Sequence, residues 1–321
     1  MQTILLTGGA GFIGSNLTRA LLADPRVGKL RVLDNFETGY RQNLAEAMSH
    51  PKFELMEGDI RDYASCVKAM EGVHIVSHQA ALGSVPRSIA DPVNSNATNI
   101  SGTLNIYTAA KEAGIKRVVY AASSSTYGDS ASLPKVEHII GRPLSPYAVT
   151  KFVMELYADV FAKTYNMEFI GLRYFNVFGP YQSPKGAYAA VIPLFMDAVI
   201  NGKAPVINGD GSFSRDFTFV DNVVQANIRA LFTENPEAVN QVYNIAFGES
   251  TTLLQLFEHI REIAQSDLQP EFGPFRKGDI PHSLANIEKA TTHLNYQPTI
   301  SVREGLKIAF NWYKEFRSYY Q

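Results

Sequence analysis

The chain has 321 residues, 45% of them hydrophobic and 19% charged, so it can bury one large core or two closely packed ones. Its formal net charge of -2, without any basic run, argues against nucleic acid or a membrane surface as a partner. A single cysteine, Cys66, excludes an internal disulfide framework and a cysteine-based zinc site, which fits a cytoplasmic location. No metal site is expected, because the closest histidines, His74 and His78, would lie about 13 Å apart on a strand.

The N-terminal half alternates short β-branched segments with longer amphipathic ones. Strands are predicted at residues 3–7, 30–34, 52–58, 73–81, 117–125 and 169–174, and helices at 12–23, 91–113 and 147–165. The nearly continuous apolar character of the strands is typical of a sheet that helices cover on both faces. The sequence therefore predicts an α/β fold with a doubly wound parallel sheet of the Rossmann type.

The regular alternation ends near residue 175, where glycine and proline become frequent. We predict a Rossmann domain at residues 1–175, onto which 206–235 packs back, and a smaller α/β lobe at 176–321 that binds the substrate. No Pro/Ser-rich linker separates the two parts, so we expect them to pack directly on each other with a cleft between them.

A glycine-rich turn joins the first predicted strand to the first helix. In TILLTGGAGFIGSNL, Gly8, Gly11 and Gly14 are spaced so that a pyrophosphate can approach backbone N–H groups at a helix N-terminus. Asp34, at the end of the second strand, can hydrogen-bond a ribose diol and would repel a 2′-phosphate. The cofactor is therefore predicted to be NAD. Asp59 either contacts the adenine or caps a helix. Further predicted cofactor contacts are Phe12, Ile13, Asn35, Ile60, Tyr147 and Lys151.

The segment SPYAVTK at 145–151 places a tyrosine and a lysine on one face of a helix. Ser145 suits the N-cap and Pro146 the first helical position, so Tyr147 and Lys151 lie one turn apart. A nearby ammonium and a helix N-terminus both favour phenolate, so we predict that the pKa of Tyr147 is lowered toward that of a general base. The serines of SSSTYG at 123–128 follow a predicted strand and would face the same crevice.

These motifs, with LRYFNVFGP at 172–180, resemble the extended short-chain dehydrogenase/reductase superfamily that acts on nucleotide sugars, nearly end to end. AASSSTYGD, LPKVE, SPYAVTK, GAYAAVIP and NGDGSFSRDF are most similar to the bacterial UDP-N-acetylglucosamine 4-epimerases of polysaccharide biosynthesis. The resemblance implies an NAD-dependent isomerase of UDP-N-acetylhexosamines that acts through a transient 4-keto sugar. UDP-glucose and UDP-galactose stay open as further substrates, because one extra pocket contact discriminates by only about 1–3 kcal/mol. The resemblance also implies a homodimer formed through helices 91–113 and 147–165.

The resemblance assigns a role to each site residue. Tyr147 would take the proton from the sugar O4, and Lys151 would bind the nicotinamide ribose and keep Tyr147 deprotonated. Ser123 would hold the reacting hydroxyl, with Ser124 as a second candidate because the triple serine leaves the register open by one. The remaining implied substrate contacts are Asn176, Arg215, Arg276 and Asp279 at the nucleotide diphosphate and ribose, Ala190 and Val191 at the uracil, and Gly83, Ser84 and Ser283 beside the acetamido group.

The same motifs also bear on alternative functions. Sugar 4,6-dehydratases carry an Asp-Glu pair beside the catalytic hydroxyl, and SSSTYG has no carboxylate, which argues against elimination. UDP-glucuronate 4-epimerases and decarboxylases share most of the motifs and stay open as alternatives. A non-catalytic NAD-binding regulatory protein would be expected to lack Tyr147, Lys151 or the serine, and all are present.

Overall fold

The computed structural model describes residues 1–185, 189–275 and 280–316. A seven-stranded sheet lies at its centre, with the strand order β11-β6-β5-β4-β1-β2-β3 and with every neighbouring pair parallel. Its strands are β1 (Gln2–Thr7), β2 (Val27–Asp34), β3 (Phe53–Glu57), β4 (Ile75–His78), β5 (Arg117–Ser123), β6 (Glu168–Tyr174) and β11 (Gln241–Ile245). The order reverses between β1 and β4, which confirms the predicted Rossmann type of sheet.

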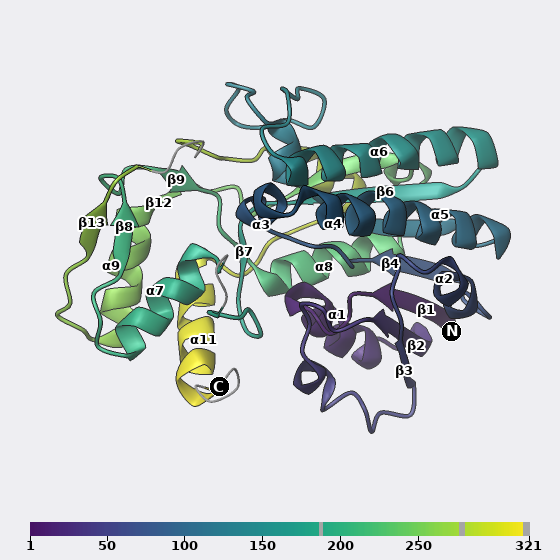
Figure 1. Cartoon of the computed structure of the whole chain (residues 1–321), viewed down its shortest axis with the longest axis horizontal. Helices are drawn as coiled ribbons and strands as arrows, with labels where there is room; N and C mark the ends of the chain where they lie inside the picture. The colour runs from purple at the N-terminus through teal and green to yellow at the C-terminus, as the bar shows by residue number, and fades with distance from the viewer. Residues whose placement is uncertain (186–188, 276–279, 317–321) are drawn as a thin grey trace.

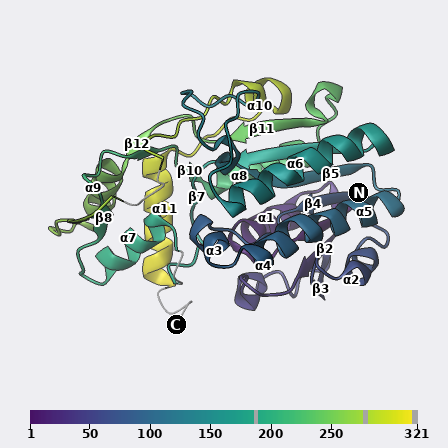
Figure 2. The same ribbon diagram turned by 45° about the horizontal axis from the view of Figure 1, so that its top comes forward.

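Helices cover both faces of this sheet (Figures 1 and 2). On one face lie α1 (Phe12–Ala23) and α8 (Val220–Leu231), and on the other lie α2 (Tyr63–Ala69), α5 (Thr103–Glu112) and α6 (Pro146–Tyr165). The alternation of side chains along β1 feeds both cores: Ile4 and Leu6 pack with α1 and α8, whereas Leu5 packs with the helices of the opposite face. Burial on both faces explains why these strands are apolar throughout.

The segment predicted as one helix at 91–113 consists of three parts. A short helix, α4 (Pro92–Asn96), leads through the π-helical turn η2 (Ala97–Gly102) into α5. The wider turn places Asn99 in the interior, where its Nδ2 donates to the carbonyl of Leu82 and to the hydroxyl of Thr150, and its Oδ1 accepts from the N–H of Leu82. π-Turns inside helices are often found at functional sites.

The chain beyond β6 forms smaller elements. They are β7 (Val177–Phe178), α7 (Val191–Ile200), β8 (Val206–Asn208), β9 (Ser214–Arg215), β10 (Thr218–Phe219), β12 (Thr251–Thr252), α9 (Leu253–Ala264), β13 (Glu271–Gly273), α10 (Glu288–Leu294) and α11 (Val302–Glu315). Helices α7, α9 and α11 contact one another and lie apart from the central sheet (Figure 1). By contrast, α8 and β11 return to the sheet, so the chain crosses between the two parts more than once. The boundary at residue 175 stays a prediction.

Shorter elements complete the fold. They are α3 (Val85–Ala90) and the 3₁₀ turns η1 (Arg41–Leu44), η3 (Ser124–Tyr127) and η4 (Pro236–Ala238). Across the described ranges, none of the helices combines the length and the apolar character that spanning a membrane requires. His78 is fully buried between the hydroxyls of Thr7 and Thr103, at 2.7 and 3.0 Å, and burial lowers its pKa to about 3. This histidine therefore has structural hydrogen bonds on both ring nitrogens.

Candidate active site

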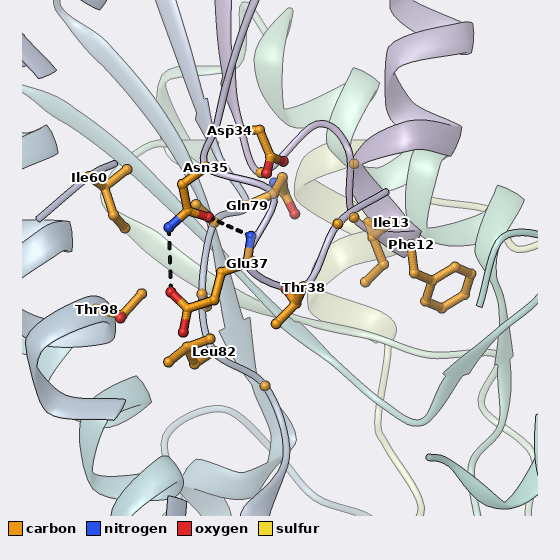
Figure 3. Close-up of a pocket in the computed structure, with 18 of the residues that line it drawn as sticks. Phe12, Ile13, Asp34, Asn35, Glu37, Thr38, Ile60, Gln79, Leu82 and Thr98 are labelled. Carbon is orange, nitrogen blue, oxygen red and sulfur yellow. Dashed lines mark hydrogen bonds between the residues drawn. The ribbon is translucent and has the colours of Figure 1, made fainter. Parts of the chain in front are cut away.

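A cavity of about 290 Å³ opens at the carboxyl ends of the central strands (Figure 3). It runs from the turn after β1 past the ends of β2 and β4 to the end of β5 and the start of α6. Parallel α/β sheets bind ligands at this edge, where the strand order reverses. The predicted site residues that line it are Gly8, Gly11, Phe12, Ile13, Gly14, Asp34, Asn35, Ile60, Gly83, Tyr147 and Lys151.

The turn between β1 and α1 requires glycine at two of its positions. Gly8 has φ +73°, and a Cβ there would lie 2.7 Å from the backbone of Ala80. A Cβ on Gly14 would lie 2.0 Å from the carbonyl oxygen of Gly8. Gly11 is the N-cap of α1, and it caps the helix with no side-chain hydrogen bond, so the first-turn N–H groups can face an anion. The turn therefore fits the pyrophosphate of a dinucleotide.

Asp34 lies at the end of β2 and is only 8% exposed. Its two carboxylate oxygens accept hydrogen bonds from the backbone N–H groups of Ala10 and Phe36, both at 2.8 Å. Burial raises the pKa of this carboxyl group, and the two backbone hydrogen bonds act in the opposite direction. Each carboxylate oxygen has a further lone pair, so Asp34 can still accept from a ribose diol in the cavity.

Asp59 lies at the rim of the cofactor cavity rather than among the residues that line it. Its carboxylate accepts from the side chains of Arg61 and Asn35, and the hydrogen bond from Arg61 is the main reason that its pKa falls to about 2. The N-cap of the following helix α2 is Asp62, not Asp59. The helix-cap interpretation of Asp59 is therefore wrong, and a contact with adenine stays a prediction.

The end of β5 and the first turn of α6 meet beside the cavity. Ser145 caps α6 by accepting from the N–H of Ala148, and Pro146 occupies the start of the helix, as predicted. Tyr147 lies close enough to Ser123 for the serine hydroxyl to lower the pKa of its phenol. The Nζ of Lys151 donates to the carbonyl of Ala121 at 2.7 Å and lies 5.9 Å from the centre of the Tyr147 ring.

The electrostatics of this pair correct the predicted lowering of the tyrosine pKa. Burial raises the pKa of Tyr147, and the nearby hydroxyl of Ser123 only opposes that change. Lys151 is 2% exposed, and burial lowers its pKa to about 8 while Glu155 acts in the opposite direction. The enclosure that brings the two groups together disfavours the charged form of both. The protein groups alone therefore leave Tyr147 protonated at neutral pH.

The two serine candidates differ in position. The buried hydroxyl of Ser123 accepts from the N–H of Ser125 at 3.1 Å and from the hydroxyl of Ser125 at 2.9 Å. Ser124 begins the 3₁₀ turn η3 that follows. It is Ser123 that lowers the pKa of Tyr147, which favours Ser123 as the partner of the tyrosine.

Several predicted substrate residues meet in the second half of the chain. Asn176 is the second residue after β6 and is exposed, with its amide 3.4 Å from the carbonyl of Asp216. The guanidinium of Arg215 donates to the carbonyls of Ser214 and Pro281. The N–H of Ser283 donates to the carbonyl of Ser214 at 3.1 Å. Asn176, Arg215 and Ser283 therefore come together around the β9–β10 segment.

The remaining predicted substrate residues lie on other elements. Ser84 is the N-cap of α3, and its hydroxyl accepts from the N–H of Arg87. Ala190 is the N-cap of α7 and Val191 begins that helix. Arg276 and Asp279 lie outside the described residues.

Sequence reasoning missed several residues of the cavity wall. They are Glu37, Thr38, Gly39, Gln79, Ala80, Ala81, Leu82, Thr98, Ala121, Ala122 and Tyr174. Most of them follow or end a strand of the sheet, and that position was the available signal. Gln79 and Tyr174 are hydrogen-bonded to each other at 2.9 Å, and both contact the buried side chain of Asn227 on α8.

Fold and cavity together are those of a Rossmann-type protein that fits a dinucleotide, with Tyr147 and Lys151 at the cavity wall. A family model described as the NAD dependent epimerase/dehydratase family matches residues 4–246, and the chain belongs to this family. NAD is its cofactor, and within the family it is an enzyme of the UDP-sugar 4-epimerase type, an isomerase.

Known proteins are similar over nearly the whole chain. The UDP-glucose 4-epimerase of Mycolicibacterium smegmatis is 35% identical over 97% of this chain and 98% of its own length. The UDP-N-acetylglucosamine 4-epimerase of Methanobrevibacter ruminantium, solved with UDP-N-acetylmuramic acid, is 38% identical with a TM-score of 0.92, covering 98% of both chains. The UDP-glucuronic acid 4-epimerase of Bacillus cereus, solved with UDP-glucuronic acid and NAD, is 29% identical with a TM-score of 0.90, covering 98% of this chain and 99% of that one.

Proposed function

We propose that the protein interconverts UDP-N-acetylglucosamine and UDP-N-acetylgalactosamine by inverting C4, with UDP-glucose and UDP-galactose as further substrates. The observation that carries this proposal is the placement of Tyr147 and Lys151 at the wall of a cavity that fits a dinucleotide, with Ser123 beside the tyrosine. The turn that follows Ser123 has no carboxylate in its sequence, and the elimination of water would need one. Redox inversion at one carbon needs only a base, a hydrogen-bond partner and the cofactor.

Each residue of the set has a proposed task. NAD, when bound, would supply a hydride acceptor for C4 of the sugar and a hydride donor for the return step. Tyr147 would take the proton from O4 as a phenolate, which the positive charges of Lys151 and of bound NAD⁺ would favour, and would return it as a phenol; its raised pKa makes that phenolate the stronger base. Ser123 holds the O4 atom beside the phenolic oxygen. Lys151, fixed by the carbonyl of Ala121, binds the nicotinamide ribose and supplies positive charge.

We assign the nucleotide end of the substrate to the second half of the chain. Asn176 and Arg215 would contact the diphosphate, because a guanidinium matches phosphate oxygens in geometry and charge. Arg276 and Asp279 would add a second clamp, and Ala190 with Val191 at the start of α7 would lie against the uracil. A 4-keto sugar held by its diphosphate can turn and present its other face.

Small side chains support the choice of an acetamido sugar. A Cβ on Gly83 would meet no atom within 4 Å, so the cavity wall is open there. Ser84 and Ser283 are also small. An acid sugar would call for a cation near its carboxylate, and among the described residues that line the cavity Lys151 is the only cation. This charge distribution favours a neutral sugar over UDP-glucuronate.

We further propose that the protein is a homodimer whose two copies pair through α5 and α6. Leu156 and Val160 lie one turn apart on α6 and are 50% and 52% exposed, and Val149 is exposed nearer the start of the helix. An apolar stripe on a helix is stabilised when a partner covers it. Light scattering should give twice the chain mass, and Leu156→Glu should shift it to the monomer mass; a monomer before substitution would contradict the proposal.

The proposed reaction is tested by NMR on the purified protein. UDP-N-acetylglucosamine, UDP-glucose and UDP-glucuronate are incubated separately, and the anomeric signals of substrate and 4-epimer are followed. We expect the acetamido sugar to convert fastest, with no net consumption of NAD. Preferred conversion of UDP-glucuronate would replace the substrate assignment. Absence of conversion for all three, with NAD bound, would favour a non-catalytic NAD-binding protein.

A further inference from the structure

Asp216 is a buried carboxyl group between the short strands β9 and β10. It is 0% exposed, and its carboxylate accepts hydrogen bonds from three backbone N–H groups. Those donors are Phe247 at 3.1 Å, Gly248 at 3.2 and 3.3 Å, and Ala285 at 3.2 Å. One side chain thus joins the β9–β10 segment to the turn after β11 and to the segment before α10.

The backbone of Asp216 adds a fourth segment to this junction. Its carbonyl lies 3.4 Å from the amide nitrogen of Asn176, which donates to it. Asn176 follows β6 with φ +25°, outside the comfortable range of most residues, so a fixed hydrogen bond helps to hold it. The junction therefore includes the segments that carry Asn176, Arg215 and Ser283.

Further hydrogen bonds join the segment at Ser214 to the segment at residues 281–283. The N–H of Ser214 donates to Pro281 at 3.0 Å, and the N–H of Ser283 donates to Ser214 at 3.1 Å. The hydroxyl of Ser214 lies 2.9 Å from Nδ1 of His282. Arg215 lies between Ser214 and Asp216 in the chain, so its backbone is held from both sides.

Burying a carboxylate at this position costs free energy, which argues that its shape and charge are needed. Burial raises the pKa of Asp216 to about 7, with the three backbone hydrogen bonds acting against that rise. A carboxylate offers two acceptor oxygens and no donor, so it can receive all three N–H groups. An amide of the same shape would turn an NH₂ group toward a backbone N–H and leave a buried donor unsatisfied.

We infer that Asp216 is a positioning residue for the nucleotide end of the substrate: it fixes Asn176, Arg215 and Ser283 relative to one another without contacting the substrate. The inference rests on the proposed function, which gives those three side chains their contacts with a UDP-sugar. Removing the carboxylate should therefore weaken binding of the nucleotide and leave the hydride chemistry at the Ser123 and Tyr147 end unchanged.

The test measures UDP binding by calorimetry on the NAD-loaded protein. Asp216→Asn should weaken UDP binding by roughly 10-fold, as expected for coupled neighbours, and should raise KM for the UDP-sugar more than it lowers kcat. Arg215→Ala should weaken UDP binding as well. If Asp216 acts through Arg215, the double variant should bind UDP nearly as well as Arg215→Ala alone.

A matched control separates positioning from folding. Asn222 on α8 is also buried, and its side chain likewise accepts two backbone N–H groups, from Thr299 and Ile300, away from the predicted substrate residues. Asn222→Ala should lower the melting temperature and leave UDP affinity unchanged. If Asp216→Asn fails to fold, Asp216→Glu, which keeps the carboxylate but displaces it by one methylene, takes its place and should still raise KM.

The outcomes distinguish the inference from the proposed function. Unchanged UDP affinity in Asp216→Asn, or in Asp216→Glu where that variant takes its place, would overturn the positioning role alone. Failure of the unsubstituted protein to bind UDP would overturn the proposed function together with this inference.

Discussion

Ser123 and Tyr147 lie beside each other where the end of β5 meets the first turn of α6. The hydroxyl of Ser123 lowers the pKa of the phenol, against the larger effect of burial, which raises it. Tyr147 lines the cofactor cavity, so the serine acts on a phenol that faces the proposed site of hydride transfer. The pair is the part of the site on which the proposed chemistry depends most.

Substitutions at this pair should separate chemistry from binding. Tyr147→Phe removes the proton acceptor and should lower kcat by about 10²- to 10⁴-fold, with NAD and UDP affinities nearly unchanged. Ser123→Ala should lower kcat by about 10²-fold, because one hydrogen bond to the reacting oxygen is lost. Ser124→Ala is the matched control and should change kcat little. A larger loss from Ser124→Ala than from Ser123→Ala would move the catalytic role to Ser124.

Lys151 should speed the reaction but lower the free energy of unfolding. Its pKa in the folded protein is about 8, below the ordinary 10.5, so the folded state binds this proton less tightly than the unfolded chain does. The penalty is complete below pH 8 and disappears as the pH rises toward 10.5. This penalty amounts to about 3 kcal/mol. Lys151→Met removes it but also loses the hydrogen bond to Ala121, so the free energy of unfolding should rise by about 1–2 kcal/mol at pH 7.

The measurement for Lys151 is thermal unfolding of the two proteins at pH 7 and at pH 10, with kcat measured beside it. Lys151→Met should be the more stable protein at pH 7, by a margin that shrinks at pH 10, and should be nearly inactive. A variant that is less stable at pH 7 would contradict the cost assigned to the buried ammonium.

Asp34→Ala should mainly weaken NAD binding. The carboxylate contributes a charge-assisted acceptor for the ribose and also holds the backbone of Ala10 and Phe36, so we expect a loss of about 10-fold or more in affinity. Because burial raises the pKa of Asp34, the affinity of the unsubstituted protein should also fall on acidification at a higher pH than an exposed aspartate would cause. Fluorescence titration with NAD measures both. Asp24→Ala, at the far end of α1, is the control, and an undiminished affinity in Asp34→Ala would show that the cofactor site is misplaced.

Glu155 and Arg173 form a buried ion pair between α6 and β6, with two hydrogen bonds at 2.7 and 2.9 Å. Glu155→Gln leaves a buried guanidinium without its counter-charge and should cost about 3–5 kcal/mol in the free energy of unfolding. Asp159, on the same helix, pairs with Lys163 in solvent, so Asp159→Asn should cost less than about 1 kcal/mol. Denaturant unfolding compares the two, and equal effects would contradict the importance given to burial.

The fold could be predicted where local pattern and burial agree. The helix at 12–23 and the strand from residue 117 follow directly from apolar periodicity and glycine placement. The strand β11 was missed, because QVYNI is short and its place beside β6 is decided by a contact about 70 residues away in the chain. The π-turn at 97–102 was missed too, since its wider spacing depends on Asn99 reaching Leu82 and Thr150.

The site could be predicted in residue types more fully than in energetics. The spacing of Tyr147 and Lys151 placed them on one helical face, and the structure has them there. The direction of the tyrosine pKa shift could not be read from spacing, because burial is the sum of contacts from several distant segments. The junction around Asp216 could not be predicted for the same reason, since its partners are 31 to 69 residues away in the chain.

The central claim is that C4 is inverted by removing and returning the same hydrogen as hydride, with Tyr147 moving only the hydroxyl proton. The direct measurement is the interconversion of UDP-N-acetylglucosamine in D₂O, with the C4 position of the product read by NMR and mass spectrometry. The account predicts a C4 epimer that carries protium at C4, because that hydrogen never exchanges with solvent. Deuterium at C4 of the product would contradict it.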